Sequence, residues 1–322
     1  MEQNRNISCI ILNYNDAGTT EKLVNQIRGY EILDSIVIVD NCSSDQSPEI
    51  LRALEGGKVH LICTEKNGGY GYGNNQGIRY AVSELHATHV LIANPDVEVS
   101  ESCIRAMAQA FSEFDRLAVS AAVTVNPAGE VQLSSWRLCG FWGDLLDTGL
   151  ITRRLFKKLL NDRPELTVSH LEPPGRSERP SRSEPPSRSE LPSVRRSYAF
   201  ADAVAGSLFL ADAAALMECG LYDEEVFLYC EEKILGCKLK KAGYRTVLLL
   251  DQRYVHHHSV SISRNVKSIR KKQELLHRSK LHYYKKYLKI NPFEEWLAKC
   301  ALRFLLAEIS FLTEVLGMNW ET

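Results

Sequence analysis

The stretch CIILNYND, residues 9–16, suggests the fold of this chain, because an apolar run ends abruptly in polar residues from Asn13 onward. The same pattern returns in SIVIVDNCSSD at 35–45 and in HVLIANPD at 89–96. Ligands of open α/β sheets bind outside the carboxyl ends of the strands. The three stretches therefore predict strands that end at one polar rim, which could hold a metal ion.

Short β-branched runs alternate with helical stretches over the first 125 residues. Strands are predicted at 7–12, 35–39, 59–63, 89–93 and 117–125. Helices are predicted between them at 19–29, 46–55, 74–86 and 101–114. Repeated βα units predict an α/β fold with a mostly parallel central sheet and helices on both faces.

Composition describes an ordinary globular protein that can bury a full core. The 322 residues are 44% hydrophobic and 25% charged, and the formal net charge of -1 gives no overall attraction to nucleic acid. The nine cysteines include no C-x-x-C pair, which favours reduced thiols in the cytoplasm. The polar residues Met1 to Ile7 predict no signal peptide, and no apolar run is long enough for a spanning helix.

The segment 164–197 differs from its surroundings, because the hexapeptides RSERPS, RSEPPS and RSELPS follow one another over 176–193. No aliphatic or aromatic residue stands between Leu171 and Leu191. Such a segment cannot offset its ordering entropy by burying apolar surface, so it is predicted to be a flexible insertion. The alternatives are a Pro-rich docking ligand and a phosphorylatable Ser/Arg tract.

Folded patterns resume after this insertion. Strands are predicted at 208–210 and 244–250, and helices at 211–219 and 231–242. The last region, 259–322, is predicted to be helical, with ten Lys/Arg and one acid, Glu274, between 264 and 289. Its apolar continuation predicts contact with an anionic membrane surface. The alternatives are a helix packed on the domain and a dimer contact.

Two of the polar strand ends could bind a nucleotide. Asp40, followed by Asn41 and two serines, could accept hydrogen bonds from a base or ribose; the alternative is an Asx turn followed by a helix cap at Asp45. The glycine-rich NGGYGYGNN at 67–75 precedes a predicted helix, so its backbone could approach a phosphate closely. It does not follow the first strand, which disfavours a dinucleotide site; a plain loop is the alternative.

Acids and histidines provide the remaining chemistry. Asp96, in NPDVE at 94–98, could hold Mg²⁺ or Mn²⁺ together with substrate phosphates, unless the segment is only a proline turn. The triplet at 256–258 could reach back to that metal or lie on a surface loop. Glu231-Glu232 could supply a general base, although acids are also common at helix starts.

The order of these motifs resembles the inverting glycosyltransferases of family 2, which have the GT-A fold, and within them the rhamnosyltransferase-like members that build bacterial polysaccharides. The resemblance covers about residues 6–290. It rests on VDNCSSD at 39–45, the glycine-rich loop at 67–78, NPD at 94–96, and the acceptor-side segments GSLFL at 206–210 and LYDE at 221–224.

The resemblance implies that a sugar moves from a UDP- or dTDP-linked donor to a glycan hydroxyl with inversion, assisted by Mg²⁺ or Mn²⁺. Asp96 and His256 would bind the metal, and Glu232, beside Glu231, would be the catalytic base. The donor-binding residues would be Asn13, Asn15, Asp40, Asn67, Gly68, Asn74 and Asn94.

The implied organisation is a nucleotide-sugar half at 1–133, an acceptor half at 134–258 and a C-terminal helical region at 259–322. A lipid-linked glycan acceptor would bring this cytoplasmic protein to the inner face of the membrane. A homodimer is also compatible with the C-terminal region.

Two positions depart from the family pattern. The family usually has Glu-Asp where this chain has Glu231-Glu232, and often a further acid where it has Ile234. Glutamate is one methylene longer than aspartate, so the carboxylate could be displaced by about 1 Å. Such a displacement can cost on the order of 10²-fold in rate. The alternative is therefore a catalytically weak or inactive nucleotide- or glycan-binding module. A sugar-phosphate nucleotidyltransferase is disfavoured. Such enzymes typically have a glycine-rich loop after the first strand, whereas this chain has NYND at 13–16.

Overall fold

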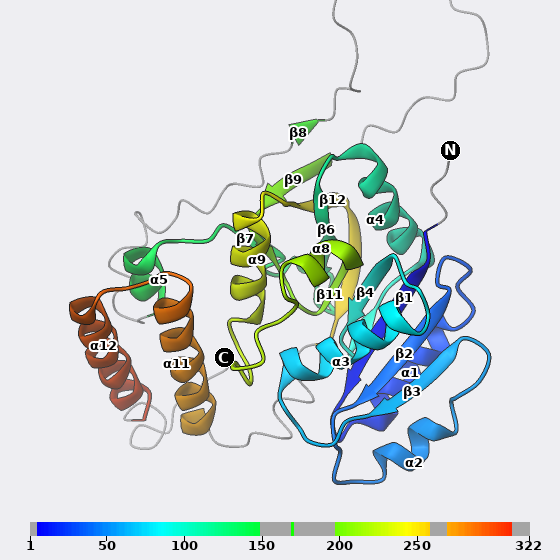
Figure 1. Ribbon diagram of the computed structural model, residues 1–322, viewed down its shortest axis with the longest axis horizontal. Helices are drawn as coiled ribbons and strands as arrows, with labels where there is room; N and C mark the ends of the chain where they lie inside the picture. The colour runs from blue at the N-terminus through cyan, green and yellow to red at the C-terminus, as the bar shows by residue number, and fades with distance from the viewer. Residues whose placement is uncertain (1–4, 149–168, 171–196, 258–268, 311–322) are drawn as a thin grey trace, which may run out of the picture.

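The computed structural model describes residues 5–148, 169–170, 197–257 and 269–310 as a mixed α/β fold (Figure 1). Its main sheet has the strand order β3-β2-β1-β4-β11-β6-β12-β9-β8, and β5 pairs with β12. The strands are β1 Ile7–Asn13, β2 Ser35–Asp40, β3 Val59–Cys63, β4 His89–Ala93, β5 Val97–Glu98, β6 Leu117–Val125, β8 Ser169–His170, β9 Ser197–Ala201, β11 Leu208–Asp212 and β12 Arg245–His256.

The first four strands of the sheet are parallel, as the sequence predicts. Strand β1 lies between β2 and β4, with Asn13 opposite Asp40 at one end. The chain moves outward from β1 to β3 and then returns to β4 on the other side. Ligands bind where the strand order reverses in this way, so the ends of β1 and β4 flank the expected crevice.

The other half of the sheet adds antiparallel strands. Strand β11 runs antiparallel to both β4 and β6, whereas β12 is parallel to β6. Strand β9 pairs antiparallel with β12, and a separate two-stranded sheet joins β7 Ser135–Trp136 to β10 Ala203–Val204. The two-residue strands β5, β7 and β10 are absent from the sequence prediction, because two residues carry no readable alternation. Strand β9, of five residues, is absent from it as well.

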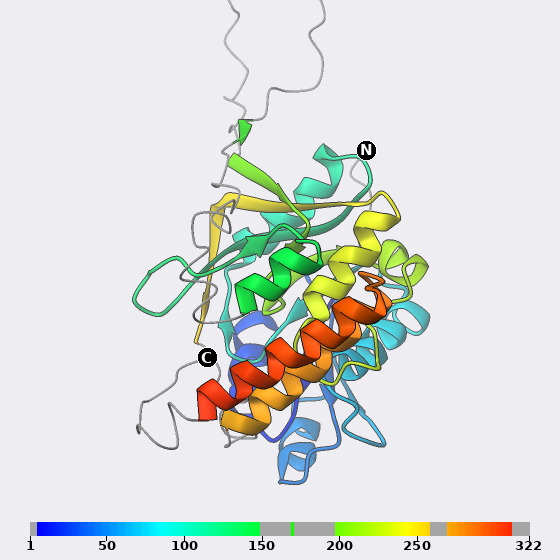
Figure 2. The ribbon, with the colours of Figure 1, turned by 90° about the vertical axis from the view of Figure 1, so that its left-hand side faces the viewer.

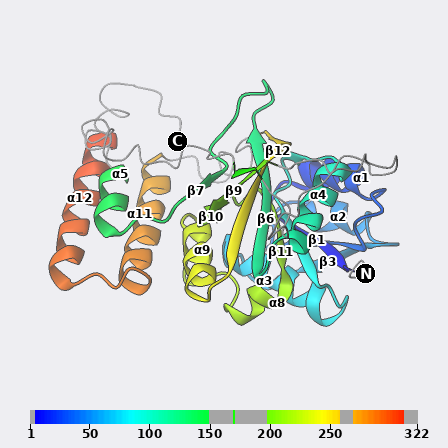
Figure 3. The same ribbon diagram turned by 90° about the horizontal axis from the view of Figure 1, so that it is seen from above.

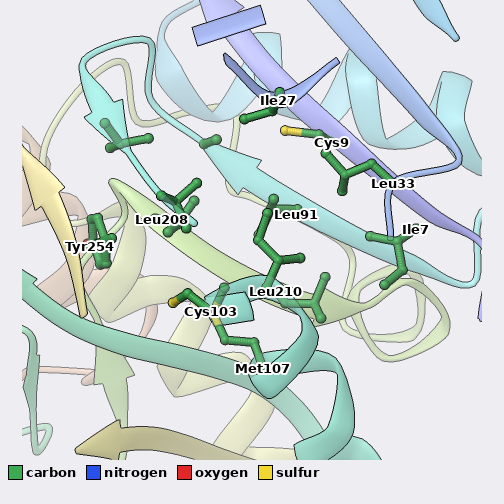
Figure 4. Close-up of a cluster of buried hydrophobic side chains, with 14 of the residues drawn as sticks. Ile7, Cys9, Ile27, Leu33, Leu91, Cys103, Met107, Leu208, Leu210 and Tyr254 are labelled. Atoms are coloured by element: carbon green, nitrogen blue, oxygen red, sulfur yellow. The ribbon is translucent and has the colours of Figure 1, made fainter. Parts of the chain in front are cut away.

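Helices cover both faces of the main sheet, and two cores result. The first core lies under α1 Ala17–Ile27 and α4 Glu101–Glu113; Figure 4 shows Cys9, Leu91, Leu208 and Met107 in it. The second lies under α3 Tyr70–Ser83, α8 Ala213–Glu218 and α9 Glu231–Lys241. The short helix α2 Ser47–Arg52 completes the N-terminal half.

Helix α3 begins at Tyr70, four residues before its predicted start. The glycines inside it allow the helix to lie directly on β1. A Cβ atom on Gly73 would stand 2.3 Å from Leu12 Cδ1, and one on Gly77 would stand 2.5 Å from Ile10 Cγ2. Tight packing on the sheet therefore outweighs the poor helix propensity of glycine.

The C-terminal helices belong to a third core. Helices α11 Ile269–Lys286 and α12 Pro292–Ser310 pack with α5 Phe141–Thr148 beside α9, on the side of the molecule away from β3 (Figures 1 and 3). Phe141, Ile234, Tyr283 and Tyr284 are buried there. Figure 2 shows α11 and α12 side by side. This observation confirms the predicted C-terminal helical extension over 269–310.

Some expectations lie outside the described residues. The hexapeptide repeats, most of the 164–197 insertion, and residues 259–268 are among them, and the boundaries at 133 and 258 stay predictions. Within the described ranges, no helix is both long and apolar enough to cross a bilayer.

Candidate active site

The donor-side rim is built where β1 and β2 end. Asn13 Nδ2 donates to Asp40 Oδ1 at 2.8 Å, and Ser43 donates to Asp40 through both its backbone N–H, at 3.0 Å, and its hydroxyl, at 2.6 Å. Asp40 is only 1% exposed. The carboxylate is therefore held rigidly, and one of its roughly four acceptor positions remains for a ligand.

Asn15 ties the same two loops together from the outside. Its backbone has φ +53° and its N–H donates to Ser43 Oγ at 2.9 Å, while its side-chain oxygen accepts from Ser44 N at 2.8 Å. An asparagine tolerates this left-handed conformation better than most residues. Asn13, Asn15 and Asp40, all predicted to bind the donor, thus lie together at one end of the sheet.

The glycine-rich loop is packed between the donor-side rim and the segment before α9. Asn41 Nδ2 donates to Asn67 Oδ1 at 3.0 Å and to Gly69 O at 3.1 Å. Gly69 has φ +93°, and a Cβ atom there would stand 2.2 Å from the carbonyl oxygen of Phe227, which accepts from Tyr70 N. The loop therefore joins the two halves of the site and is not an open phosphate loop.

Three more residues of this loop and α3 hold that junction. Gly68 lies against the ring of Tyr72, since a Cβ there would be 2.4 Å from its Cγ. Asn74 is buried and donates to Tyr70 O at 3.0 Å. Asn75 donates to the carbonyl of Tyr222 and accepts from its N–H. These contacts give Asn74 and Asn75 positioning roles, and contact of Gly68 or Asn74 with a donor stays a prediction.

Asp96 and His256, predicted as metal ligands, lie together. The Nε2 atom of His256 is 3.3 Å from Asp96 Oδ1, and both side chains are largely buried. The neighbouring His257 instead pairs with Glu98 at 2.7 Å. Strand β5 brings about this separation, because Val97 and Glu98 pair with β12 through His256 and Val255.

The donor set of this pair fits a divalent cation. One carboxylate and one imidazole suit Mn²⁺, and substrate phosphates usually complete such a site. In the part of the chain that the structure describes, no group of three or more His, Cys, Asp or Glu side chains could hold a metal.

A cavity of about 460 Å³ brings four of the eleven predicted site residues together. Asn94, His256, Glu231 and Glu232 all line it. Asn94 follows β4 and accepts from Tyr70 Oη at 3.3 Å, and Tyr70 also donates to Gly206 O at 2.7 Å. The other predicted residues are not among the lining residues: Asn13, Asn15, Asp40, Asn67, Gly68, Asn74 and Asp96.

The two glutamates differ in environment. Glu231 is 5% exposed, and burial together with the charge of Glu232 raises its pKa to about 8. Burial also raises the pKa of Glu232, but a hydrogen bond from the Gly206 backbone N–H opposes the rise. Near pH 7 Glu231 is therefore mostly protonated, and Glu232 is the better candidate for an ionised base.

A buried ion cluster beside the cavity is absent from the sequence prediction. Asp144 of α5 pairs with Lys233 and, at 2.9 Å, with Lys280, and accepts from Tyr284 Oη at 2.8 Å. Although burial alone would raise the pKa of Asp144, the two ammonium groups hold it well below its usual range. A signal existed in α11: Gln273, His277, Lys280 and Tyr284 are buried at helical core spacing.

Comparisons with known proteins identify the family of this chain. A family model described as glycosyl transferase family 2 matches residues 8–168, half of the chain. A hexosyltransferase of low-salt glycan biosynthesis, Agl10 of Haloferax volcanii, is 37% identical over 99 residues, which are 31% of this chain and 30% of that protein. An N-acetylglucosaminyl-diphospho-decaprenol L-rhamnosyltransferase of Mycobacterium tuberculosis is 25% identical over 72% of this chain and 69% of that protein.

Solved structures share the fold at low sequence identity. A mannosyltransferase of Pyrobaculum calidifontis, PcManGT, in complex with GDP-Man and Mn²⁺, superposes with a TM-score of 0.56 at 12% identity, covering 99% of this chain and 77% of that one. GalNAc-T7 with UDP, GalNAc and Mn²⁺ gives a TM-score of 0.54 at 13% identity, covering 98% and 58%. With the matching family model, these findings show that the chain belongs to glycosyl transferase family 2 and has the GT-A fold.

Proposed function

We propose that this protein is an inverting, metal-dependent glycosyltransferase of surface glycan synthesis. It moves a sugar from a UDP- or dTDP-linked donor to a hydroxyl of a growing glycan. One observation carries the proposal: a single cavity is lined by the strand-end residue Asn94, by His256 of the Asp96–His256 pair, and by Glu232. These residues are the parts that donor binding, leaving-group stabilisation and base catalysis require.

The nucleotide binds at the donor-side rim. Asp40, held by Asn13 and Ser43, keeps one acceptor position for a ribose or base, and Asn15 fixes the loop beside it. The rim stands at the ends of β1 and β2, and Asn94 stands at the end of β4, where the strand order reverses. The diphosphate then lies toward Asn94 and the Asp96–His256 pair.

Asp96 and His256 hold Mg²⁺ or Mn²⁺ when the donor is bound. A divalent cation in that position neutralises the charge that develops on the diphosphate leaving group. The presence of Mn²⁺ in two structural neighbours supports this assignment.

Glu232 acts as the base at the start of α9. It removes the proton of the acceptor hydroxyl, whose oxygen attacks the anomeric carbon while the bond from that carbon to the diphosphate oxygen breaks. A single displacement of this kind inverts the anomeric configuration. The hydrogen bond from Gly206 N–H favours the ionised form of Glu232 that the step needs.

The acceptor is a glycan, and a lipid-linked one is the favoured form, as the name of the mycobacterial relative suggests. The exposed side of α12 supports peripheral contact with the inner face of the membrane. Phe293, Trp296 and Phe304 are each at least 60% exposed there, and Lys299 and Arg303 are exposed beside them. Aromatic and basic residues on one helix face are typical of interfacial helices. A homodimer through α12 is the alternative use of this face.

Donor turnover in the presence of Mn²⁺ tests the proposal. Asp96→Ala and Glu232→Gln are each expected to lower turnover by at least 10²-fold. His257→Ala is the matched control, because His257 pairs with exposed Glu98, and should retain turnover within about twofold. Wild-type turnover in both Asp96→Ala and Glu232→Gln would refute the assigned roles.

A binding module that lost catalysis is the second candidate. The Glu231-Glu232 pair favours it, because burial raises the pKa of both carboxyl groups and the usual aspartate is absent. Calorimetry decides between the two: nucleotide-sugar binding without transfer to any acceptor supports the binding module. Glu232→Asp provides a second measurement, since a gain in turnover would show that the longer side chain limits catalysis.

A further inference from the structure

The backbone at Gly206, between β10 and β11, lies directly against the side chain of Glu232. Gly206 is buried, and its N–H donates a hydrogen bond to the Glu232 carboxylate. A Cβ atom on Gly206 would stand only 2.6 Å from Glu232 Oε1, so the backbone can approach this closely because the residue is a glycine. The position of Gly206 therefore determines where the carboxylate lies and how well its ionised form is stabilised.

A side chain holds the carbonyl of Gly206 in place. On either side of it, the N–H of Ala205 and the carbonyl of Ser207 have backbone partners, which no side-chain substitution removes. The carbonyl of Gly206 instead accepts a hydrogen bond from the hydroxyl of Tyr70 at 2.7 Å. The placement of Gly206 thus depends on a group that a single substitution can delete.

Tyr70, the first residue of α3, is itself well anchored. Its N–H donates to Phe227 O at 2.9 Å, and its ring packs edge-on against Tyr222 with 5.8 Å between the centroids. The hydroxyl also lies 3.3 Å from Asn94 Oδ1, but a hydroxyl has one proton, and the shorter contact with Gly206 is the stronger one. The ring is therefore fixed in a position from which its hydroxyl holds the Gly206 carbonyl.

The hydroxyl of Tyr70 stays protonated in this environment. Burial, followed by the charges of Glu232 and Glu231, raises the pKa of Tyr70 well above its ordinary value. The pKa values of Tyr222 and of Lys233, which also interact with Glu232, are raised as well, so both keep their protons near pH 7. Replacing Tyr70 by phenylalanine therefore removes a hydrogen bond and no charge.

We propose that Tyr70 is a positioning residue for catalysis: its hydroxyl holds the Gly206 backbone, and Gly206 holds the carboxylate of Glu232 in the orientation that proton removal needs. Tyr70 then acts through Gly206 on the base. The start of α3 thereby becomes part of the machinery that orients a residue of α9. The inference rests on the proposed transferase function, in which Glu232 is the base.

The experiment compares Tyr70→Phe with the wild type, because phenylalanine keeps the ring. Tyr80→Phe is the matched control: Tyr80 also lies on α3, its hydroxyl contacts His60 Nδ1 at 3.5 Å, and it does not line the cavity. Turnover of UDP- and dTDP-sugars with Mn²⁺ between about pH 5 and 9 gives kcat and the donor KM. The ionisation of Glu232 is measured separately by NMR of carboxyl-labelled glutamate, and Glu232→Gln identifies its signal.

Tyr70→Phe should lower kcat about tenfold and change the donor KM by less than about twofold. The acidic limb of the kcat profile and the titration of Glu232 should both move up by about one pH unit, because a displaced N–H stabilises the ionised carboxylate less. In the Glu232→Gln background, Tyr70→Phe should change the residual kcat by less than about twofold, since the base on which it acts is absent. Tyr80→Phe should match the wild type, and thermal unfolding verifies that each variant is folded.

Three results would overturn the inference: Tyr70→Phe retains the wild-type kcat, Glu232 titrates in it as in the wild type, or kcat falls by the same factor with and without Glu232. Failure of the proposed function gives a different result, namely a wild type that turns over no nucleotide sugar. The NMR titration then still decides whether Tyr70 orients Glu232.

Discussion

The donor-side rim and the acceptor-side cavity use buried carboxyl groups in opposite ways. At the rim, Asp40 accepts three hydrogen bonds from Asn13 and Ser43. At the cavity, Glu231 is similarly buried, yet its Oε1 has no hydrogen-bond partner in the described part of the chain. The carboxylate at the rim thus has three partners within the fold, whereas one oxygen of Glu231 has none among the described residues.

This difference separates the carboxyl group whose hydrogen bonds form on folding from the one that keeps an oxygen without a partner in the folded protein. A carboxylate with internal partners stabilises the fold, because losing it would leave buried donors unpaired. A buried carboxyl without partners destabilises the fold, and such a cost is typical of functional sites. Removing a carboxylate should therefore have opposite effects on stability in the two regions.

The largest effect is expected for Asp144→Ala, which breaks the ion cluster under the cavity. It leaves the ammonium groups of Lys233 and Lys280 without their carboxylate, which typically costs about 3–5 kcal/mol. Thermal unfolding at pH 7 should show a fall of roughly 6–15 °C in Tm. Asp147→Ala, an exposed change on the same helix, should shift Tm by no more than about 2 °C.

The same variant has a defined pH dependence. The folded pKa of Asp144 lies below its ordinary value of 3.8, so its stabilisation is present above that pH. It is lost as the pH falls through the lowered folded pKa. The difference in Tm between wild type and Asp144→Ala should therefore shrink below about pH 4; a constant difference would contradict the assigned ion pairs.

Asp40→Ala tests the completeness of the rim. It removes three hydrogen bonds and leaves donors of the buried Asn13 and the half-buried Ser43 without this acceptor, so a loss of about 2–3 kcal/mol in unfolding free energy is expected. Asp45→Ala provides the control in the same loop. Asp45 is exposed and, among the described residues, accepts from Ser47 N, so its loss should cost about 0.5–1 kcal/mol. Equal losses in urea unfolding would show that the rim is not pre-assembled.

Glu231→Gln should have the smallest effect and the opposite sign. The folded pKa of Glu231, about 8, lies above its ordinary value of 4.5, so the folded state holds a proton that the unfolded state releases between these values. Wild-type stability then falls as pH rises through that window, whereas glutamine does not titrate. The variant should gain about 1–2 kcal/mol over wild type at pH 7.5, or roughly 2–4 °C in Tm.

This gain should shrink toward pH 4.5 and disappear below it, where the carboxyl group is protonated in both states. Thermal unfolding of both proteins between pH 4.5 and 8 measures it. A glutamine variant less stable than wild type at pH 7.5 would mean that the folded state stabilises the ionised form of Glu231, and the contrast with Asp40 would fail.

Local patterns were sufficient to predict much of the fold. The parallel strands β1 to β4 and helices α4 and α9 lie close to their predicted bounds, and Ser100 caps α4 by accepting from Cys103 N as its position implies. Helix α3 was placed four residues late, because its glycines are helical only through contact with β1. The basic run in α11 was predicted to face a membrane, although Lys280 is buried against Asp144, 136 residues away.

The sequence by itself determined the strands, their polar ends and the family, because these depend on local alternation and on short motifs such as VDNCSSD. Only the tertiary structure decided that Asp96 and His256 lie within 3.3 Å of each other, that Glu231 is buried, and that Trp136 and Lys280 line the cavity beside it. The reason is physical: burial and ion pairing depend on residues brought close by the sheet and by the C-terminal helices. No local pattern carries these distances.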